Sequence, residues 1–188
     1  MNPSDLSFGP LSEADRAQVD GFSCGDEDYH EQISRFLIED ALWQQNAGLN
    51  ATTLFFHDDE LVGYTTLIAS SLSLGSNRSL KSLFGLPKVS RALEIGRKIF
   101  PAVLIGYLAT HKAFQNQHVA SIMLAFAIAE TVRSPIGARF IHIDVDRRNE
   151  EAQHFWSRKG FVFDEEANKS RHDLFGYLDL YYDINPGA

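Results

Sequence analysis

The feature that most constrains this sequence is a continuous stretch over residues 103–133. It opens with an apolar run of strand length at 103–110, passes through a polar turn at 111–118 and closes with a long apolar segment at 119–132. This order predicts a buried strand, a tight turn and a helix. A helix leaves its first backbone N–H groups unpaired, and its dipole favours negative charge there. The turn is therefore predicted to be a seat for phosphate.

The centre of this turn reads QNQHVA over residues 115–120. Phosphate-binding turns usually contain glycine, because the backbone approaches the ligand closely and often with positive φ. This turn has none. It nevertheless resembles the acyl-CoA signature of the GNAT acyltransferase superfamily, which reads Gln or Arg, two residues, Gly, one residue, then Gly or Ala. Gln115 and Ala120 match the two ends, and His118 stands where the central glycine belongs.

The resemblance extends over nearly the whole chain. Four segments follow in the order and spacing of GNAT proteins: FSCGDEDYHEQISRFL, ATTLFFHDDELVGYTTL, FPAVLIGYLAT and NEEAQHFWSRKGF. They resemble in particular the branch that contains the acetyltransferase toxins of bacterial toxin–antitoxin pairs. The pieces FSCG and AQHFWSRKGF are the most specific to that branch.

The resemblance implies an α/β (α+β) fold, a mixed and mostly antiparallel sheet with helices on both faces and splayed central strands. The residue patterns place the remaining elements. We expect an opening strand and short helix within 5–20, a helix capped by Asp26, hairpin strands at 52–56 and 61–69, a fifth strand at 140–145, a last helix at 149–159 ended by Gly160, and final strands at 161–163 and 176–182.

Length and composition favour one domain over residues 1–188, because 44% hydrophobic content can fill one sizeable core and no linker divides it. There is no apolar run of membrane-spanning length and no leader pattern, so we expect a soluble, cytoplasmic protein without membrane contact. Cys24 is the only cysteine. This excludes an internal disulfide and favours a small buried thiol under the first helix.

The net charge of −8 argues against a general affinity for nucleic acid, but the charge is uneven. Residues 77–100 hold six basic side chains against the single acid Glu94, a local charge of +5. Two interpretations stay open: a solvated face of an inserted helical segment, or a docking patch for a phosphate-bearing substrate such as tRNA.

The resemblance also implies acetyl-CoA as acyl donor. Its pantetheine arm would pair with the strand backbone at Leu108 and Thr110, and its diphosphate would sit on the amides of residues 117–121. Asn149 would touch the pantetheine, although it is equally a good helix N-cap, and Phe155 would pack beside the thioester. The expected binding residues are Leu108, Ala109, Thr110, Gln115, Asn116, Gln117, His118, Val119, Ala120, Ser121, Asn149 and Phe155.

Acyl transfer needs a deprotonated amine, polarisation of the thioester carbonyl and a proton for the leaving thiolate. Backbone N–H groups near Leu108 can polarise the thioester carbonyl. Relatives commonly carry Tyr as the acid where this chain has Trp156, and an indole cannot release its proton near neutral pH. Three interpretations follow: solvent or an imidazole such as His154 or His142 replaces the phenol, Trp156 is core, or the protein binds acyl-CoA with little or no catalysis.

Two further questions concern charge. His118 either lends positive charge to the diphosphate or narrows the site, and tolerance of positive φ beside a helix N-terminus favours the first. His142 and Asp144 alone make a weak metal pattern, so no metal is expected.

The acceptor would be an amine, with aminoacyl-tRNA leading over a polyamine or a lysine. An antitoxin partner and a homodimer follow from the resemblance. The rival is a non-catalytic acyl-CoA-binding or protein-interaction module.

Overall fold

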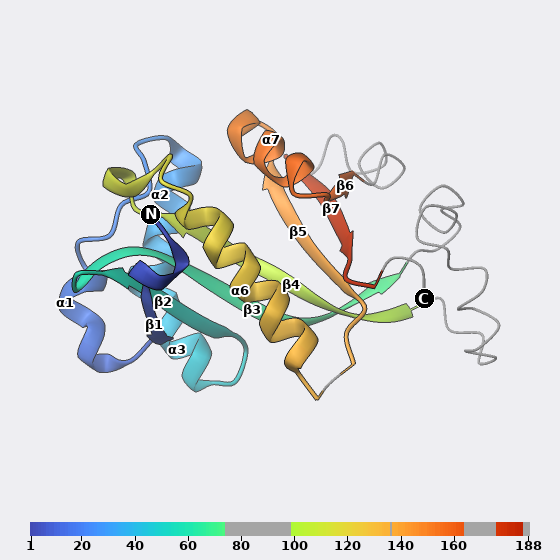
Figure 1. Cartoon of the computed structure of the whole chain (residues 1–188), viewed down its shortest axis with the longest axis horizontal. Coiled ribbons are helices and arrows are strands. Elements are labelled where there is room, and N and C mark those ends of the chain that lie inside the picture. Colours follow the sequence, from blue (N-terminus) through green and yellow to red (C-terminus); the bar gives the residue numbers. More distant parts are fainter. Residues whose placement is uncertain (74–98, 136, 164–175, 186–188) are drawn as a thin grey trace. The chain divides into compact units, whose positions relative to one another are not determined.

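The computed structural model describes residues 1–73, 99–135, 137–163 and 176–185. The chain, drawn in Figure 1, divides into two compact units. The N-terminal unit comprises Met1–Ala69 and Ile105–Glu130, and the C-terminal unit comprises Ser70–Leu104 and Thr131–Ala188. The basic segment, apart from its last two residues, lies outside the described residues.

Seven strands form a sheet in the order β1-β2-β3-β4-β5-β7-β6. The pairs β1–β2, β2–β3, β5–β7 and β6–β7 are antiparallel, and β4–β5 is parallel. This confirms the predicted mixed, mostly antiparallel sheet. The strands are β1 (Ser7–Pro10), β2 (Ala51–His57), β3 (Glu60–Ser73), β4 (Ile99–Thr110), β5 (Phe140–Asp146), β6 (Val162–Phe163) and β7 (Tyr177–Asp183).

The helices fall close to their predicted positions. The longest, α6, begins at Val119 and ends at Arg133, within one residue of the predicted segment. Three short 3₁₀ turns accompany the helices: η1 (Pro3–Asp5), η2 (Glu13–Asp15) and η4 (Lys112–Phe114). The others are α1 (Arg16–Val19), α2 (Asp28–Arg35), the π-helical η3 (Phe36–Asp40), α3 (Ala41–Asn46) and α7 (Glu150–Arg158).

The sheet of the N-terminal unit is covered on both faces, as predicted. Successive strand side chains alternate between faces, so Leu54 and Tyr64 pack with Phe36 and Leu37 of the helical segment, whereas Phe55 and Val62 pack with Val119 and Met123 of α6. Both sets are buried. The helix α6 therefore lies flat on one face, with its first turn beside the end of β4.

The turn between β2 and β3 confirms the predicted hairpin. Asp58 and Asp59 both have positive φ, 47° and 65°. Two consecutive residues of this kind make the turn that matches the twist of a hairpin, and short polar Asp tolerates it.

The predicted Asp26 cap is wrong. Helix α2 begins at Asp28, and its N-cap residue Glu27 makes no side-chain capping hydrogen bond. The carboxylate of Asp26 instead lies 3.4 Å from Nζ of Lys112, far away in sequence. Further along this helical segment, where the backbone widens to a π-helix, Nη1 of Arg16 donates to the carbonyl of Ile38 at 3.2 Å.

In the C-terminal unit, the parallel ladder between β4 and β5 covers three residue pairs, from Ala102–Phe140 to Leu104–His142. Both strands continue beyond these pairs, β4 to Thr110 and β5 to Asp146. Phe100, Phe140 and Tyr181 form part of the core. A buried ion pair joins Arg139 and Asp183 at 2.8 Å.

Candidate functional site

The predicted strand, turn and helix are present, and the turn is fixed at its start by long-range hydrogen bonds. The amide of His111 donates to the carbonyl of Val62 at 2.8 Å, and the amide of Lys112 donates to the carbonyl of Ser23 at 2.8 Å. Nδ1 of His111 accepts from the amide of Ala113 at 3.3 Å. Burial lowers the pKa of His111, with the Lys112 charge adding to this effect. The turn is therefore held before it reaches the predicted phosphate seat.

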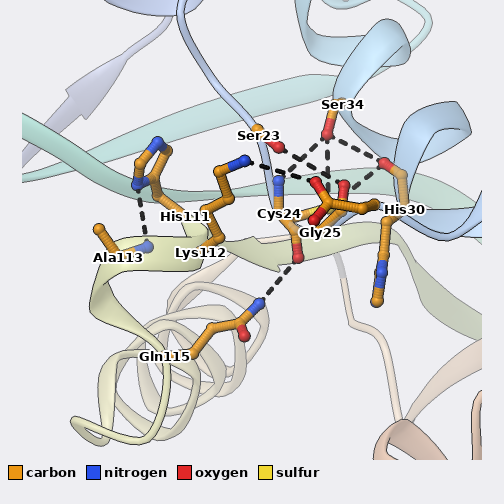
Figure 2. A network of polar contacts seen from close by, with 10 residues as sticks. Ser23, Cys24, Gly25, His30, Ser34, His111, Lys112, Ala113 and Gln115 are labelled. Atoms are coloured by element: carbon orange, nitrogen blue, oxygen red, sulfur yellow. Dashed lines mark hydrogen bonds and ion pairs between the residues drawn. The ribbon is translucent and has the colours of Figure 1, made fainter.

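Gln115 holds the middle of the turn. Its Nε2 donates to the carbonyl of Cys24 at 2.8 Å, so its side-chain donor is directed at the 23–25 loop (Figure 2). That loop is itself fixed to α2, because the amide of Cys24 donates to Oγ of Ser34 at 3.2 Å. Cys24 is buried, as predicted, and burial raises the pKa of its thiol. The side chain of Gln115 thus links the turn to the 23–25 loop and, through that loop, to α2.

Two residues of the turn adopt the left-handed backbone conformation. Asn116 has φ 61° and His118 has φ 67°. Asn is the non-glycine residue that best tolerates this region, and His is also enriched there. The glycine position of the signature thus keeps the backbone shape that glycine usually provides, with an exposed imidazole added.

The backbone amides around His118 differ in whether they have a hydrogen-bond partner. The amides of Ser121 and Ile122 both donate to the carbonyl of His118, at 3.0 and 3.2 Å, which starts the helix. Within the described part of the chain, the amides of residues 117–120 donate no hydrogen bond. Of the expected donors at 117–121, the amide of Ser121 already donates within the helix start. Free amides and the positive end of a 15-residue helix make an anion seat.

A second unpaired group lies at the end of β4. Oγ1 of Thr110 is buried and has no hydrogen-bond partner in the described structure. Buried hydroxyls are nearly always paired, so an orphan of this kind calls for an explanation. The free amides and the orphan hydroxyl both fit a ligand with an anionic head and a polar arm, as CoA has.

The predicted residues of α7 belong to the C-terminal unit. Asn149 caps this helix, because its Oδ1 accepts from the amide of Ala152 at 2.9 Å. The capping interpretation is thus confirmed, and Nδ2 stays without a partner among the described residues. Gly160, with φ 88°, follows the helix end as predicted.

Trp156 is buried, with 3% of its surface exposed. It packs edge-on against Phe155 at 5.0 Å and against Phe161 at 4.8 Å. His154 lies on the exposed side of α7 in a shallow pocket with Glu150, Gln153, Ser157 and Phe163. Residues two apart on a helix point about 200° away from each other. His154 and Trp156 therefore face different surroundings, which makes joint action of the two side chains on one group unfavourable.

His142 is half-buried on β5, and its Nε2 lies 2.8 Å from Oγ of Ser70. Burial lowers the pKa of His142, with the charge of Asp179 opposing the effect. The imidazole is therefore neutral near pH 7 and could accept a proton. The described residues contain no group of three side chains arranged to hold a metal ion.

The family model described as "Acetyltransferase (GNAT) family" matches residues 16–161. The chain belongs to the GNAT acetyltransferase family. No curated protein sequence matches it. Among solved structures, a tyrosine mutant of KacT is similar with 23% identity and a TM-score of 0.69, covering 96% of this chain and 95% of that chain.

Two AtaT structures are similar as well. AtaT complexed with acetyl-methionyl-tRNAfMet has 21% identity and a TM-score of 0.67, covering 95% of each chain. AtaTR bound with AcCoA has 19% identity and a TM-score of 0.65, covering 96% of this chain and 94% of that chain. These likenesses show the fold that the GNAT protein shares with toxin–antitoxin acetyltransferases. No described helix is long and apolar enough to cross a membrane.

Within this GNAT protein, the expected binding residues divide between the two units. Those at 108–121 lie together in the N-terminal unit, whereas Asn149, His154, Phe155 and Trp156 lie in the C-terminal unit. The sequence did not predict the hydrogen bond from Gln115 to the 23–25 loop or the unpaired hydroxyl of Thr110. The spacing of the motifs could not reveal either, although a Thr at the end of a buried strand, next to a turn predicted to bind phosphate, is a usable signal.

Proposed function

We propose that this GNAT protein transfers an acetyl group from acetyl-CoA to the amine of an acceptor, with aminoacyl-tRNA as the acceptor class. The observation that carries the proposal is the run of unpaired amides at residues 117–120, at the start of α6. A diphosphate is one of the anions that free amides at a helix start can bind.

The residues take the following roles. The amides of residues 117–120 hold the diphosphate, and the end of β4 at Leu108 and Thr110 offers backbone groups to the pantetheine arm. Asn149 can donate from Nδ2 while its Oδ1 keeps the helix cap. Bound acetyl-CoA supplies the activated acyl group as a thioester. Burial favours the neutral form of the His142 imidazole by lowering its pKa, and the neutral form is the one that can accept a proton from an amine.

The fold relatives support the acceptor and partner classes. AtaT has been solved with an acetylated aminoacyl-tRNA and also with its antitoxin AtaR. By this likeness we propose an RNA-linked amine as acceptor and an antitoxin as partner. A homodimer is proposed from the family resemblance alone. A polyamine or a lysine would meet the same chemical requirement.

Two measurements test the proposal on the full chain. Calorimetric titration with acetyl-CoA should give saturable binding. Release of free CoA, followed with a thiol reagent, should then depend on added aminoacyl-tRNA and not on deacylated tRNA. The buried thiol of Cys24 gives a slow background that a Cys24→Ser variant removes. Absence of binding at millimolar acetyl-CoA refutes the whole proposal, and release with polyamine alone refutes the tRNA acceptor.

A second candidate is a binding module with little catalysis, because the chain has Trp156 where relatives commonly carry Tyr as the acid. An indole cannot protonate a thiolate, and 3% exposure leaves this side chain little access to a ligand. The variant Trp156→Tyr, compared with Trp156→Phe, separates the two candidates. If a phenol is the missing acid, Tyr raises turnover and Phe does not. Equal effects of Tyr and Phe indicate packing alone.

A further inference from the structure

A serine and a histidine from distant parts of the chain meet in the C-terminal unit. Oγ of Ser70 on β3 lies 2.8 Å from Nε2 of His142 on β5. The strand β4 runs between these two strands, and its small Ala102, paired with Phe140, is on the face of His142. A side chain of this size leaves room for the hydroxyl and the imidazole to meet across β4. Their separation is that of a nucleophile and its base.

A buried carboxylate lies on the same face of the sheet. In the antiparallel ladder between β5 and β7, His142 pairs with Tyr181 and Asp144 pairs with Asp179. Paired residues and residues two apart share a face, so Asp179 is a diagonal neighbour of His142. Asp179 has only 6% of its surface exposed. The three residue types of a serine, histidine and aspartate site are therefore brought together from β3, β5 and β7.

Burial and the carboxylate act on His142 in opposite directions. Burial lowers the pKa of His142, which favours the neutral imidazole, whereas the charge of Asp179 raises this pKa. In the neutral imidazole with its proton on Nδ1, Nε2 can accept from the hydroxyl of Ser70. Once Nε2 has taken a proton, the negative charge of Asp179 stabilises the imidazolium. A general base needs both properties.

The pair is not sealed inside the core. Ser70 and His142 are each half-buried, and Ser71 and Asp144 beside them are exposed. The residues Ser70, His142 and Asp179 all belong to the C-terminal unit, whereas the free amides at 117–120 belong to the N-terminal unit. The serine and histidine are therefore a candidate site of their own, independent of the anion seat.

We propose that Ser70 is a nucleophile with His142 as its general base and Asp179 as the stabilising carboxylate, and that this site hydrolyses small acyl esters. Oγ of Ser70 bonds to the ester carbonyl carbon while its proton passes to Nε2. The bond from that carbon to the alcohol oxygen then breaks, and the leaving alcohol takes the proton from Nε2. Water repeats both steps on the acyl-serine, which releases the carboxylic acid and restores the hydroxyl.

The direct test is a fluorophosphonate probe, which an activated serine attacks at phosphorus with loss of fluoride. Wild type should gain one adduct, which peptide mass mapping locates at Ser70. Ser70→Ala should abolish this adduct. Ser71→Ala removes the exposed neighbouring hydroxyl on the same strand, and this matched control should keep the adduct. Absence of an adduct in wild type, or an adduct at Ser71, overturns the inference.

Hydrolysis of p-nitrophenyl acetate tests the roles of the base and the carboxylate. The difference in rate between wild type and Ser70→Ala is the part that depends on the serine. His142→Gln should lower this part by about 100-fold, because the general base is removed. Asp179→Asn should also lower it. Equal rates for wild type and Ser70→Ala mean that the hydrogen bond is structural only, which overturns the inference even if His142→Gln fails to fold.

These outcomes are separate from those of the proposed acetyl transfer. If wild type binds no acetyl-CoA but is labelled at Ser70 and hydrolyses the ester, the proposed function fails and the ester site stands. If wild type binds acetyl-CoA and releases CoA to aminoacyl-tRNA but is not labelled, the ester site fails and the proposed function stands.

Discussion

The two helices that follow predicted site segments begin in opposite ways. At the start of α7, Asn149 caps the first turn with its own side chain, and Glu150 and Glu151 add negative charge beside the positive end of the helix. At the start of α6, the first turn holds no acid, and the amides of residues 117–120 stay unpaired. One helix start is satisfied internally and the other is left open.

The difference teaches where an external anion can bind. A cap residue and first-turn acids stabilise a helix and also occupy the donors that an anion would need. The start of α6 has neither a capping side chain nor a first-turn acid, and His118 adopts a positive φ there. The first amides of α6 are instead left to water or to a bound ligand. Variants that exchange these features should therefore move binding and stability in opposite directions.

The largest effect is expected from giving α6 the acid that α7 carries. Ala120→Glu places a carboxylate in the first turn of α6, beside the free amides. A unit charge about 6 Å from another at an effective dielectric near 20 costs ~3 kcal/mol, so affinity for acetyl-CoA should fall about 100-fold. Free Ala120→Glu should melt at or above the wild-type temperature, because the acid interacts well with the helix dipole.

Ala125→Glu is the matched control, since Ala125 is exposed in the middle of the same helix. It adds the same charge away from the first turn and should change the affinity less than threefold. Equal losses for both variants, measured by calorimetry, would mean that net charge and not the open helix start governs binding.

The second-largest effect is expected from substitutions at the start of α7. Asn149→Ala removes the bond to the amide of Ala152 and should lower the free energy of unfolding by about 1 kcal/mol. Asn149→Asp keeps the capping oxygen and loses the Nδ2 donor. If Nδ2 touches the acyl donor, Asn149→Asp keeps the wild-type melting temperature and binds acetyl-CoA several-fold more weakly. Unchanged affinity would leave Asn149 with a capping role alone.

The contrast between the two helix starts was partly predictable from sequence. The apolar runs before and after the turn fixed the limits of β4 and α6 to within a few residues, because burial demands a run of matching length. The Asn149 cap and the Gly160 stop follow from local residue preferences. Local preference also made His118 acceptable at a position where glycine is usual.

Long-range contacts decided the features that the sequence did not predict. Asp26 is the first of three consecutive acids, of which the third, Asp28, begins α2, and local preference cannot choose the cap among them. Its partner Lys112 is 86 positions away. Gln115 finds its acceptor Cys24 across 91 positions. The hydroxyl of Thr110 lacks a hydrogen-bond partner because several elements bury it, which a local sequence pattern does not show. The π-helical turn at Phe36–Asp40 has no known sequence signal.

A smaller effect is expected at the glycine position of α6. His118→Gly relieves a left-handed residue with a side chain, which should stabilise the fold by up to about 1 kcal/mol, less the entropy that glycine adds to the unfolded chain. If the imidazole lends charge to the diphosphate, wild-type affinity for acetyl-CoA falls as pH rises through the histidine range, and His118→Gly shows no such fall. Parallel pH profiles for the two proteins would remove the cationic role.

The smallest effect contrasts exposed His118 with half-buried His142 of the C-terminal unit. Burial lowers the pKa of His142 below its ordinary value of 6.5, so the unfolded chain takes up a proton at a higher pH than the folded chain. Stability is therefore fully present above the ordinary value and is lost as pH falls toward the lowered one. Urea titrations across this range should show a free energy of unfolding that declines with acid. His142→Gln should flatten the decline, and His118→Gln, at a histidine exposed on the surface, is the matched control. An equal slope in wild type and His142→Gln would mean that another group, such as His111, carries the pH dependence, because burial lowers the pKa of His111 in the same direction.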